Sequence, residues 1–399
     1  MQDREETLGP EHIELAPWPH FDEEMVRSVE AVLRSGKVNQ WTGGEVRTFE
    51  REYAEALGIG HAIAVANGTV ALELALVALG IGAGDEVITS PRASIASASC
   101  AVMRGALPAF ADVDPDSQNI TAMAIEQAIT PRTRAIVTVH LAGWPCEMDP
   151  ILELAEKHGL YVVEDCAQAH GATYKGRPVG TMGHVGCFSF CQGNIITTGG
   201  EGGLAVTNDA ELWSRMWSHK DHGKSYDAVF NRKWPPGFRW LHESFGTNWR
   251  LTEIQAALGR AQLRRLPDWV EARGRNAAAL AEGLSPVPGL RVPVPSAHVR
   301  HAYCRFCCFV RPEHLRAGWD RDRIVAEITT RGVPCTIGVC PEVYPESALD
   351  TGMPPDSRLP VARELGATSL MLPVHPTLTE RDIGRMADVV RDVVLTASG

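Results

Sequence analysis

Two short polar segments stand at the ends of apolar stretches and could carry chemistry. Asn67, Gly68 and Thr69 lie between an apolar run and a helical run. Free N–H groups at a helix start bind phosphate, although an ordinary helix cap would use the same residues. Glu164 and Asp165 end the apolar run LYVVEDCA, where a carboxylate needs a partner. The protonated nitrogen of a pyridine ring is one such partner, and capping the next helix is the alternative.

The surrounding pattern predicts the elements that hold these segments. Residues 21–57 read as two amphipathic helices around a loop at 38–45. From residue 61 onward, short apolar strands alternate with helices, which predicts a mostly parallel central sheet flanked by helices. Ligands of such sheets lie beyond the carboxyl ends of the strands. The loops expected to build the site follow residues 67, 90, 141, 165 and 190.

A second, smaller domain of mixed helices and strands is expected after the sheet. Residues 251–284 form a long helical pattern that we expect Pro267 to break. A strand-like run at 302–310 and a helical run at 320–332 follow. The predicted division is an N-terminal arm (1–20), a large α/β domain that holds the site (21–262) and a small C-terminal α+β domain (263–399).

Composition excludes several classes of protein. The 399 residues are 44% hydrophobic and 22% charged, which excludes bulk disorder. A net charge of -11 argues against nucleic acid as a partner. No apolar window is long enough to span a membrane, and the acidic N-terminus does not resemble a signal peptide. We therefore expect a cytoplasmic protein without a membrane partner.

The ten cysteines fall mostly inside apolar runs, which predicts buried, reduced thiols. Cys304 and Cys307 form a CxxC pair within a strand-like run. No second ligand pair stands at a suitable spacing, so we expect no metal site.

Five motifs in a fixed order carry a family resemblance: NGT, VEDCAQAHGA, GHVGCFSF, ITTGGEGGLAVTND and FGTNWRLTEIQAALG. The chain resembles the DegT/StrS family of sugar aminotransferases, which use pyridoxal phosphate (PLP), from about residue 20 to its end. The resemblance implies the PLP-transferase fold type I, which is α/β with a mostly parallel central sheet flanked by helices and a smaller α+β C-terminal domain.

The resemblance also implies roles for single residues. Gly68 and Thr69 would hold the cofactor phosphate, and Ser189 would donate its hydroxyl to the same group. Asp165 would pair with the pyridinium nitrogen, and Gln168 would lie near the ring hydroxyl or the phosphate.

One implied role belongs to a neighbouring subunit. Asn248, in GTNWR, would reach the phosphate of the other subunit's site, which implies a dimer with two shared sites. The loop around Asn39–Thr42 would help line the substrate side.

The sequence departs from the family pattern at two positions. Family members carry a lysine that links to the cofactor, in a pattern like SFxxxKxxTTGGEGG, and this position holds Asn194. An amide neither titrates nor forms an imine with the cofactor aldehyde, and a positioned acid–base group contributes roughly 10²–10⁴ in rate. Ser94 stands where an aromatic residue usually stacks on the ring, which is worth about 0.5–1.5 kcal/mol. Any PLP, or its amine form pyridoxamine phosphate (PMP), would therefore bind noncovalently.

Another side chain could replace the missing base. The segment SHKDHGK offers His219, Lys220 and His222, of which Lys220 is the better candidate. A solvated loop is the alternative interpretation of this segment. Lys175 lies in a turn that is exposed in the family and is a weak candidate.

Three functions remain open from the sequence. The first is an aminotransferase-family protein that acts on a nucleotide-linked keto or amino sugar or a cyclitol, in sugar or antibiotic biosynthesis. The second is a lysine-independent, PMP-dependent sugar dehydratase. The third is a non-catalytic subunit that completes the site of an intact aminotransferase in a heterodimer, rather than forming a homodimer.

Overall fold

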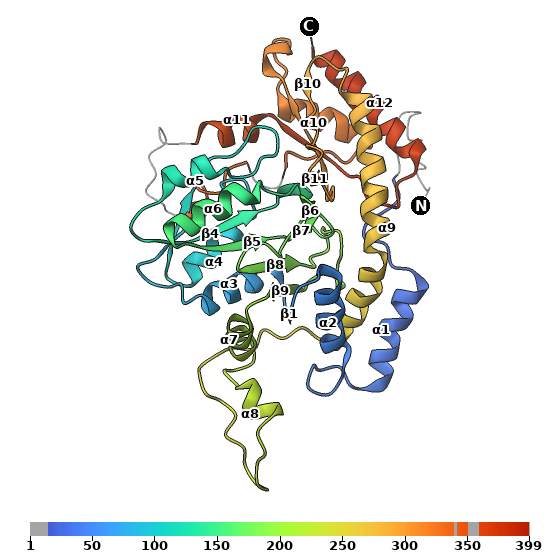
Figure 1. Cartoon of the computed structure of the whole chain (residues 1–399). Helices are drawn as coiled ribbons and strands as arrows, with labels where there is room; N and C mark the ends of the chain where they lie inside the picture. Colours follow the sequence, from blue (N-terminus) through green and yellow to red (C-terminus); the bar gives the residue numbers. More distant parts are fainter. Residues whose placement is uncertain (1–14, 339–340, 350–358, 399) are drawn as a thin grey trace.

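A computed structural model of the chain describes residues 15–338, 341–349 and 359–398 (Figure 1). Its N-terminal part forms α1 (Glu23–Ser35) and α2 (Glu45–Leu57), which confirms the two helices expected around a loop. The side chain of Asp22 caps α1 by accepting from the N–H of Met25, and Gly36, in the left-handed region, ends it. Both helices lie beside the long helix α9 (Glu253–Leu284).

A seven-stranded sheet forms the centre of the molecule, with the strand order β1-β9-β8-β5-β4-β2-β3. β9 runs in the opposite direction to the other six strands of this sheet, which confirms a mostly parallel sheet. Its strands are β1 (His61–Val65), β2 (Glu86–Thr89), β3 (Leu107–Phe110), β4 (Thr133–Val139), β5 (Tyr161–Asp165), β8 (Val185–Ser189) and β9 (Gly203–Thr207).

Helices cover both faces of this sheet, because successive strand residues point to opposite sides. Val163 packs with α3, α4 and α7, whereas Val162 packs with α5 and α6. The covering helices are α3 (Gly68–Ala78), α4 (Ala96–Met103), α5 (Ala122–Ala128), α6 (Met148–His158) and α7 (Ala210–Lys220).

Two small three-stranded sheets accompany the central one. One joins β11, β6 and β7, and the other joins β10, β12 and β13. Their strands are β6 (Thr173–Tyr174), β7 (Arg177–Pro178), β10 (Leu290–Arg291), β11 (Val299–Arg300), β12 (Phe306–Val310) and β13 (Ser369–Leu372). The other helices are α8 (Tyr226–Phe230), α9 (Glu253–Leu284), α10 (Arg321–Thr330), α11 (Pro360–Thr368) and α12 (Glu380–Ala397).

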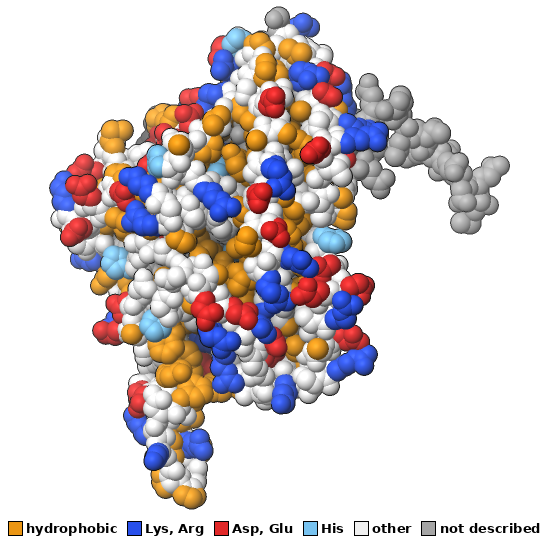
Figure 2. Space-filling view, turned by 45° about the vertical axis from the view of Figure 1, so that its right-hand side comes forward, with side chains coloured by type: hydrophobic (Ala, Val, Ile, Leu, Met, Phe, Trp, Pro, Cys, Tyr) orange, Lys and Arg blue, Asp and Glu red, His pale blue; other side chains and the backbone are white. Residues whose placement is uncertain are grey.

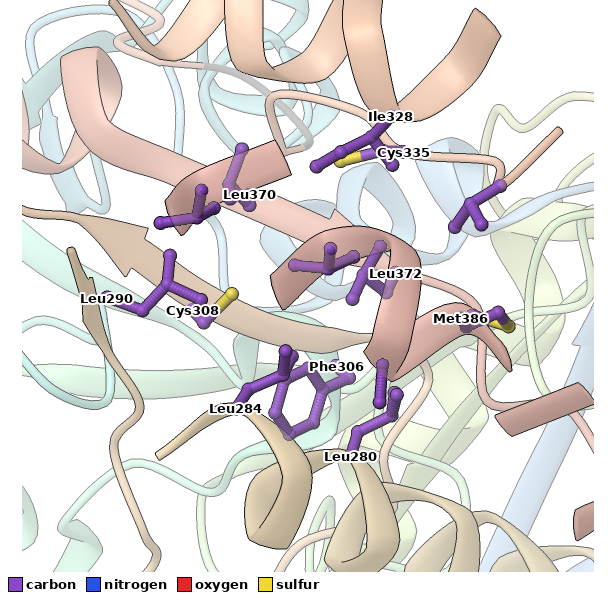
Figure 3. Packing of buried hydrophobic residues seen from close by; sticks show 14 of the residues in the cluster. Leu280, Leu284, Leu290, Phe306, Cys308, Ile328, Cys335, Leu370, Leu372 and Met386 are labelled. Carbon is purple, nitrogen blue, oxygen red and sulfur yellow. The ribbon is translucent and has the colours of Figure 1, made fainter. Parts of the chain in front are cut away.

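The C-terminal part has a hydrophobic core of its own, as expected for a smaller α+β unit. Leu280 and Leu284 of α9 pack there against Phe306 of β12 and Leu372 of β13 (Figure 3). Met386 of α12 closes the same cluster.

Helix α9 runs through Pro267 without a break, so the expected interruption is wrong. A proline inside a helix removes one backbone hydrogen bond and costs about 3 kcal/mol. Here a capping box at Thr252 starts the helix, and buried residues at both ends hold it. Ala256 packs with residues of the large α/β part, and Leu280 packs in the C-terminal hydrophobic core described above. The expected domain boundary at residue 262 therefore falls inside one continuous helix.

The nine cysteines within the described residues are free, and seven of them are buried. Burial raises the pKa of Cys100 to about 12, which keeps this thiol protonated and unreactive. Cys340 lies outside the described residues. None of the described helices combines the length and apolar character that crossing a bilayer requires.

Candidate functional site

A cavity of about 560 Å³ opens at the carboxyl ends of the central strands, where the topology predicts a site. It lies between the start of α3, the end of β5 and the turn after β8. The structure brings seven of the predicted site residues together in its wall: Gly68, Thr69, Ser94, Asp165, Gln168, Ser189 and Asn194.

Asp165 places a buried carboxylate in this wall. The hydroxyl of Ser97 donates to one carboxylate oxygen at 2.7 Å, and the N–H of Ala167 donates to the other at 3.1 Å. Burial raises the pKa of Asp165, against the effect of the Ser97 hydrogen bond. No lysine, arginine or histidine within the described ranges forms an ion pair with it. A cationic donor on a ligand would supply the partner that the chain does not.

The neighbouring Glu164 points to the opposite face of the sheet and has a structural task. Its carboxylate lies 3.1 Å from His140 and accepts from backbone N–H groups of Gly180, Met182 and Gly183. Burial would raise the pKa of Glu164, but His140 and these N–H groups outweigh it and lower the pKa. Glu164 therefore anchors the turn beside β5.

Glu164 also belongs to a trio of potential metal ligands with His140 and Cys166. All three are buried, and their ligand atoms lie within 4.8 Å of one another. The carboxylate oxygens already accept several hydrogen bonds. This polar network explains the trio without a metal.

The start of α3 forms the other end of the cavity. The Asn67 side chain accepts from the N–H of Val70 at 3.0 Å and caps the helix. The first N–H groups of a helix, here those of Gly68 and Thr69, have no partner within the helix. A Cβ atom at Gly68 would lie 2.5 Å from the Cβ of Ser189, so only glycine allows this contact. Together with the Ser189 hydroxyl, these groups can receive an anion such as phosphate.

Asn194 lines the cavity, and its side-chain N–H₂ and both backbone groups form hydrogen bonds within the chain. The side-chain amide donates to the carbonyl of Ser189 at 2.9 Å. The Asn194 carbonyl accepts from the indole of Trp18 at 3.1 Å, and its N–H donates to Cys191 at 3.0 Å. Asn194 thus braces the turn after β8. Among the described residues that line the cavity there is no lysine.

Gln168 and Ser94 complete the predicted set. The carbonyl oxygen of Gln168 accepts from the N–H of Ala142 at 2.7 Å, so the loop after residue 141 supports the site through Gln168 rather than lining it. Ser94 lies just before α4 on the cavity wall. Phe188 is the one aromatic residue among the described residues of this wall.

The candidate replacement bases do not line the cavity. Lys220 is fully buried, with its amine 3.1 Å from the carbonyl oxygen of Gln40 and 3.9 Å from Glu50. Burial lowers the pKa of Lys220, and Glu50 opposes this effect. His219 is half-buried and contacts a tryptophan ring, whereas His222 is exposed.

Asn248 and the loop at Asn39–Thr42 also lie outside this cavity. Asn248 is exposed and follows the projecting arm of residues 221–247. Trp41 lines a separate cavity of about 320 Å³ with Trp217. Lys175 is exposed as expected and pairs with Asp149.

Sequence reasoning missed three contributors. Cys191 and Glu201 line the cavity, and Ser97 holds Asp165. Cys191 follows GHVGCFSF and Glu201 lies in ITTGGEGGLAVTND, so their motif positions were the available signal. Ser97 is one serine among several in SPRASIASAS and gave no signal of its own.

Comparisons with known proteins show the family to which the chain belongs. Residues 19–391 match the model of the DegT/DnrJ/EryC1/StrS aminotransferase family. The chain is 36% identical over 393 residues to the dTDP-3-amino-3,4,6-trideoxy-alpha-D-glucose transaminase of Streptomyces venezuelae, covering 98% of each protein. It is 39% identical to the GDP-perosamine synthase of Caulobacter vibrioides, over 87% of this chain and 89% of that protein.

Solved structures show the same likeness. An aminotransferase from Psychrobacter cryohalolentis is 53% identical and superimposes with a TM-score of 0.94, over 96% of this chain and 100% of the other. Both the family match and the relatives extend over nearly the whole chain. The chain therefore belongs to the DegT/DnrJ/EryC1/StrS aminotransferase family.

Proposed function

We propose that the chain binds PLP or PMP noncovalently in the cavity at the ends of the central strands. There it would act on a nucleotide-linked keto or amino sugar. The observation that carries the proposal is the buried Asp165 carboxylate, which faces a cavity and has no cationic partner among the described residues.

The residues of the cavity fit the two ends of this cofactor. Asp165 would pair with the ring nitrogen and hold a proton there. The N–H groups of Gly68 and Thr69, with the Ser189 hydroxyl, would bind the phosphate. When bound, the cofactor would supply an electron-accepting ring, together with an aldehyde that can receive an amino group (PLP) or an amine that can donate one (PMP).

Asn194 limits the acid–base chemistry that the chain can carry out in this cavity. Its amide can position a neighbouring group by hydrogen bonding, but it cannot take up or release a proton. Gln168 keeps its N–H₂ group for a ligand, since its oxygen is held by Ala142. The cofactor would thus be held by hydrogen bonds and charge alone. We expect slow turnover in the absence of another base.

The relatives support the substrate class. One is named for an amino sugar linked to dTDP and another for one linked to GDP. A relative from Acidithiobacillus ferrooxidans, 38% identical over 88% of both proteins, is a UDP-N-acetyl-3-dehydro-alpha-D-glucosamine 3-aminotransferase by name. These relatives differ in the nucleotide and share an amino sugar, so we extend only the sugar class to this chain.

A dimer forms part of the proposal. Phe245, at the arm of residues 221–247, is 99% exposed, and Trp240 is 74% exposed. Hydrophobic side chains gather over the projecting segment at the bottom of the molecule (Figure 2). A partner subunit would cover them, and Asn248 could then reach the partner's cofactor phosphate.

Absorbance spectroscopy tests the proposal. The protein is incubated with PLP or PMP, desalted and scanned, then treated with borohydride and weighed by mass spectrometry. We expect retained cofactor and no covalent mass increase. Retention with a covalent adduct would show that a lysine elsewhere is used, and loss of both forms on desalting would refute cofactor binding.

The missing lysine and the exposed Asn248 favour a second candidate, the non-catalytic subunit of a heterodimer. Asn248 of this chain would then complete the site of a partner that keeps the lysine. Co-expression with such a family member distinguishes the two. A stable heterodimer more active than the partner alone would favour the second candidate, and no association would exclude it.

A further inference from the structure

A second cavity, of about 580 Å³, lies across the turn after β8 from the cofactor cavity. Gln192 and Gly193 line this second cavity, whereas Cys191 and Asn194 line the first. The two cavities therefore share one four-residue turn. Trp18, which lines the second cavity, binds the Asn194 carbonyl at 3.1 Å and fixes the turn between them.

Arg305 supplies the charge of this second cavity. No aspartate or glutamate occurs among its described lining residues, and Arg305 forms no ion pair with a described residue. One Nη group of Arg305 donates to the carbonyl of Cys304 at 2.8 Å. Its other N–H groups are left for a ligand. Burial lowers the pKa of His375, which also lines this cavity, to about 4, so this ring is neutral at pH 7.

A second guanidinium lies behind the wall. Arg273 is fully buried, and its centre lies 4.9 Å from the centre of the Trp18 ring. One Nη group donates to the carbonyls of Tyr303 and Cys304, while its Nε and other Nη have no hydrogen-bond partner. Arg273 pairs with no carboxylate among the described residues. Two unpaired positive charges and no acidic residue make the cavity attractive to anions.

We propose that this second cavity is an anion subsite, in which Arg305 binds a phosphate or carboxylate group of a ligand whose other end reaches the cofactor cavity. A guanidinium binds both groups through two parallel hydrogen bonds. The shared turn borders both cavities, so an anion held by Arg305 would lie across this turn from Asn194. Thr336 and Trp18 would border it. The ligand's identity rests on the proposed function, but the binding of an anion does not.

Two molecules could bring this anion. A sugar nucleotide carries a diphosphate, and a dicarboxylic amino donor carries a second carboxylate. Both present two adjacent oxygens to an arginine, so the structure fixes the chemistry they share. Separate probes, UDP and L-glutamate, distinguish the two sources.

Isothermal titration calorimetry on the cofactor-free protein tests the subsite. UDP and L-glutamate are titrated into the unaltered chain, into Arg305→Gln and into Arg300→Gln. Arg300 is exposed and lines neither cavity, so its replacement removes the same charge elsewhere. We expect at least one probe to bind the unaltered chain. Arg305→Gln should weaken that probe about ten-fold or more, and Arg300→Gln should leave it within about two-fold.

A second variant tests the subsite independently, in case Arg305→Gln does not fold. Thr336 is exposed at the rim, so Thr336→Glu adds a negative charge without disturbing the core. It should weaken the same probe. Binding of neither probe to the unaltered chain, or equal binding to all variants, overturns the subsite. Because no cofactor is present, failure here is distinct from failure of the proposed function.

Discussion

At the scale of single residues, Asp165 is the buried carboxylate on which the proposed cofactor site depends. Asp165 is 6% exposed as a residue, burial raises the pKa of its carboxyl, and it forms no ion pair with a cation among the described residues. A buried charge lowers the stability of the ligand-free protein. Such a residue is typical of a binding site, where stability is given up for a ligand.

Replacing Asp165 should separate stability from binding. Asp165→Asn removes the buried charge and can keep hydrogen bonds to Ser97 and Ala167, so the cofactor-free chain should melt at a higher temperature. Cofactor affinity should fall about ten-fold or more, because the pair with the ring nitrogen is lost. Thermal melting and a PLP titration measure both. Asp149→Asn, at an exposed acid, is the control and should leave affinity unchanged.

The same residue predicts a pH dependence. Because burial raises the pKa of Asp165, the folded chain binds a proton at a higher pH than the unfolded chain does. The stability lost to the buried charge is therefore regained as the pH falls through the folded-state pKa. The gain in melting temperature of Asp165→Asn should shrink on acidification from pH 7. A constant gain would show that this carboxyl does not titrate as described.

Asn194→Lys should restore a covalent link to PLP. The side chain at this position lines the cavity, so a lysine there can reach the ligand. We expect a mass increase after borohydride treatment. Gln192→Lys, in the same turn but facing the second cavity, is the matched control and should give none. If both variants or neither retained a covalent adduct, the assignment of residue 194 would be wrong.

The site residues that could be predicted from the sequence lie within recognisable motifs. Gly68, Asp165 and Ser189 each end or start an element within a recognisable string, and the structure places all three in one cavity. Ser97 was missed because its partner comes from an element distant in sequence. Lys220 is the opposite case. Its amine suggested a replacement base, but the side chain is buried beside Gln40 and does not line the cofactor cavity.

At the scale of elements, the contact between α3 and β8 shapes the phosphate end. Gly68→Ala would press a methyl group onto Ser189 and should destabilise the fold by about 1–3 kcal/mol. It should also abolish cofactor retention. Gly274 in α9 has open space, so Gly274→Ala should be neutral or stabilising by up to about 1 kcal/mol. Chemical denaturation measures both, and equal stabilities would contradict the close contact.

Hydrophobic periodicity predicted which segments form helices and strands. It did not predict the continuity of α9 or the direction of β9. Alternation predicted the parallel strands because each is a short apolar run. Pro267 was expected to break α9, since the local penalty is visible in the sequence and the compensating tertiary packing is not. The direction of β9 depends on a hydrogen-bond register that periodicity does not encode.

At the scale of the whole molecule, the projecting arm of residues 221–247 exposes large aromatic side chains that the proposed dimer would cover. Its exposed Trp240 and Phe245 predict that a double change, Trp240→Ser with Phe245→Ser, weakens dimerisation about ten-fold or more. Cofactor retention should fall with it, because Asn248 would no longer reach the neighbouring site. Light scattering measures the mass of the assembly in solution and so distinguishes a dimer from a monomer. Met123→Ser, at a residue 72% exposed on α5, is the control. A monomeric unaltered chain would contradict the shared site.

The most direct measurement is a crystal structure of the protein soaked in PLP. We expect the ring nitrogen beside Asp165, the phosphate at the N–H groups of Gly68 and Thr69, and no bond to any side chain. Clear density for protein with no ligand at these groups, or a ligand bonded covalently to a residue, would contradict the central claim that this cavity holds the cofactor without a tether.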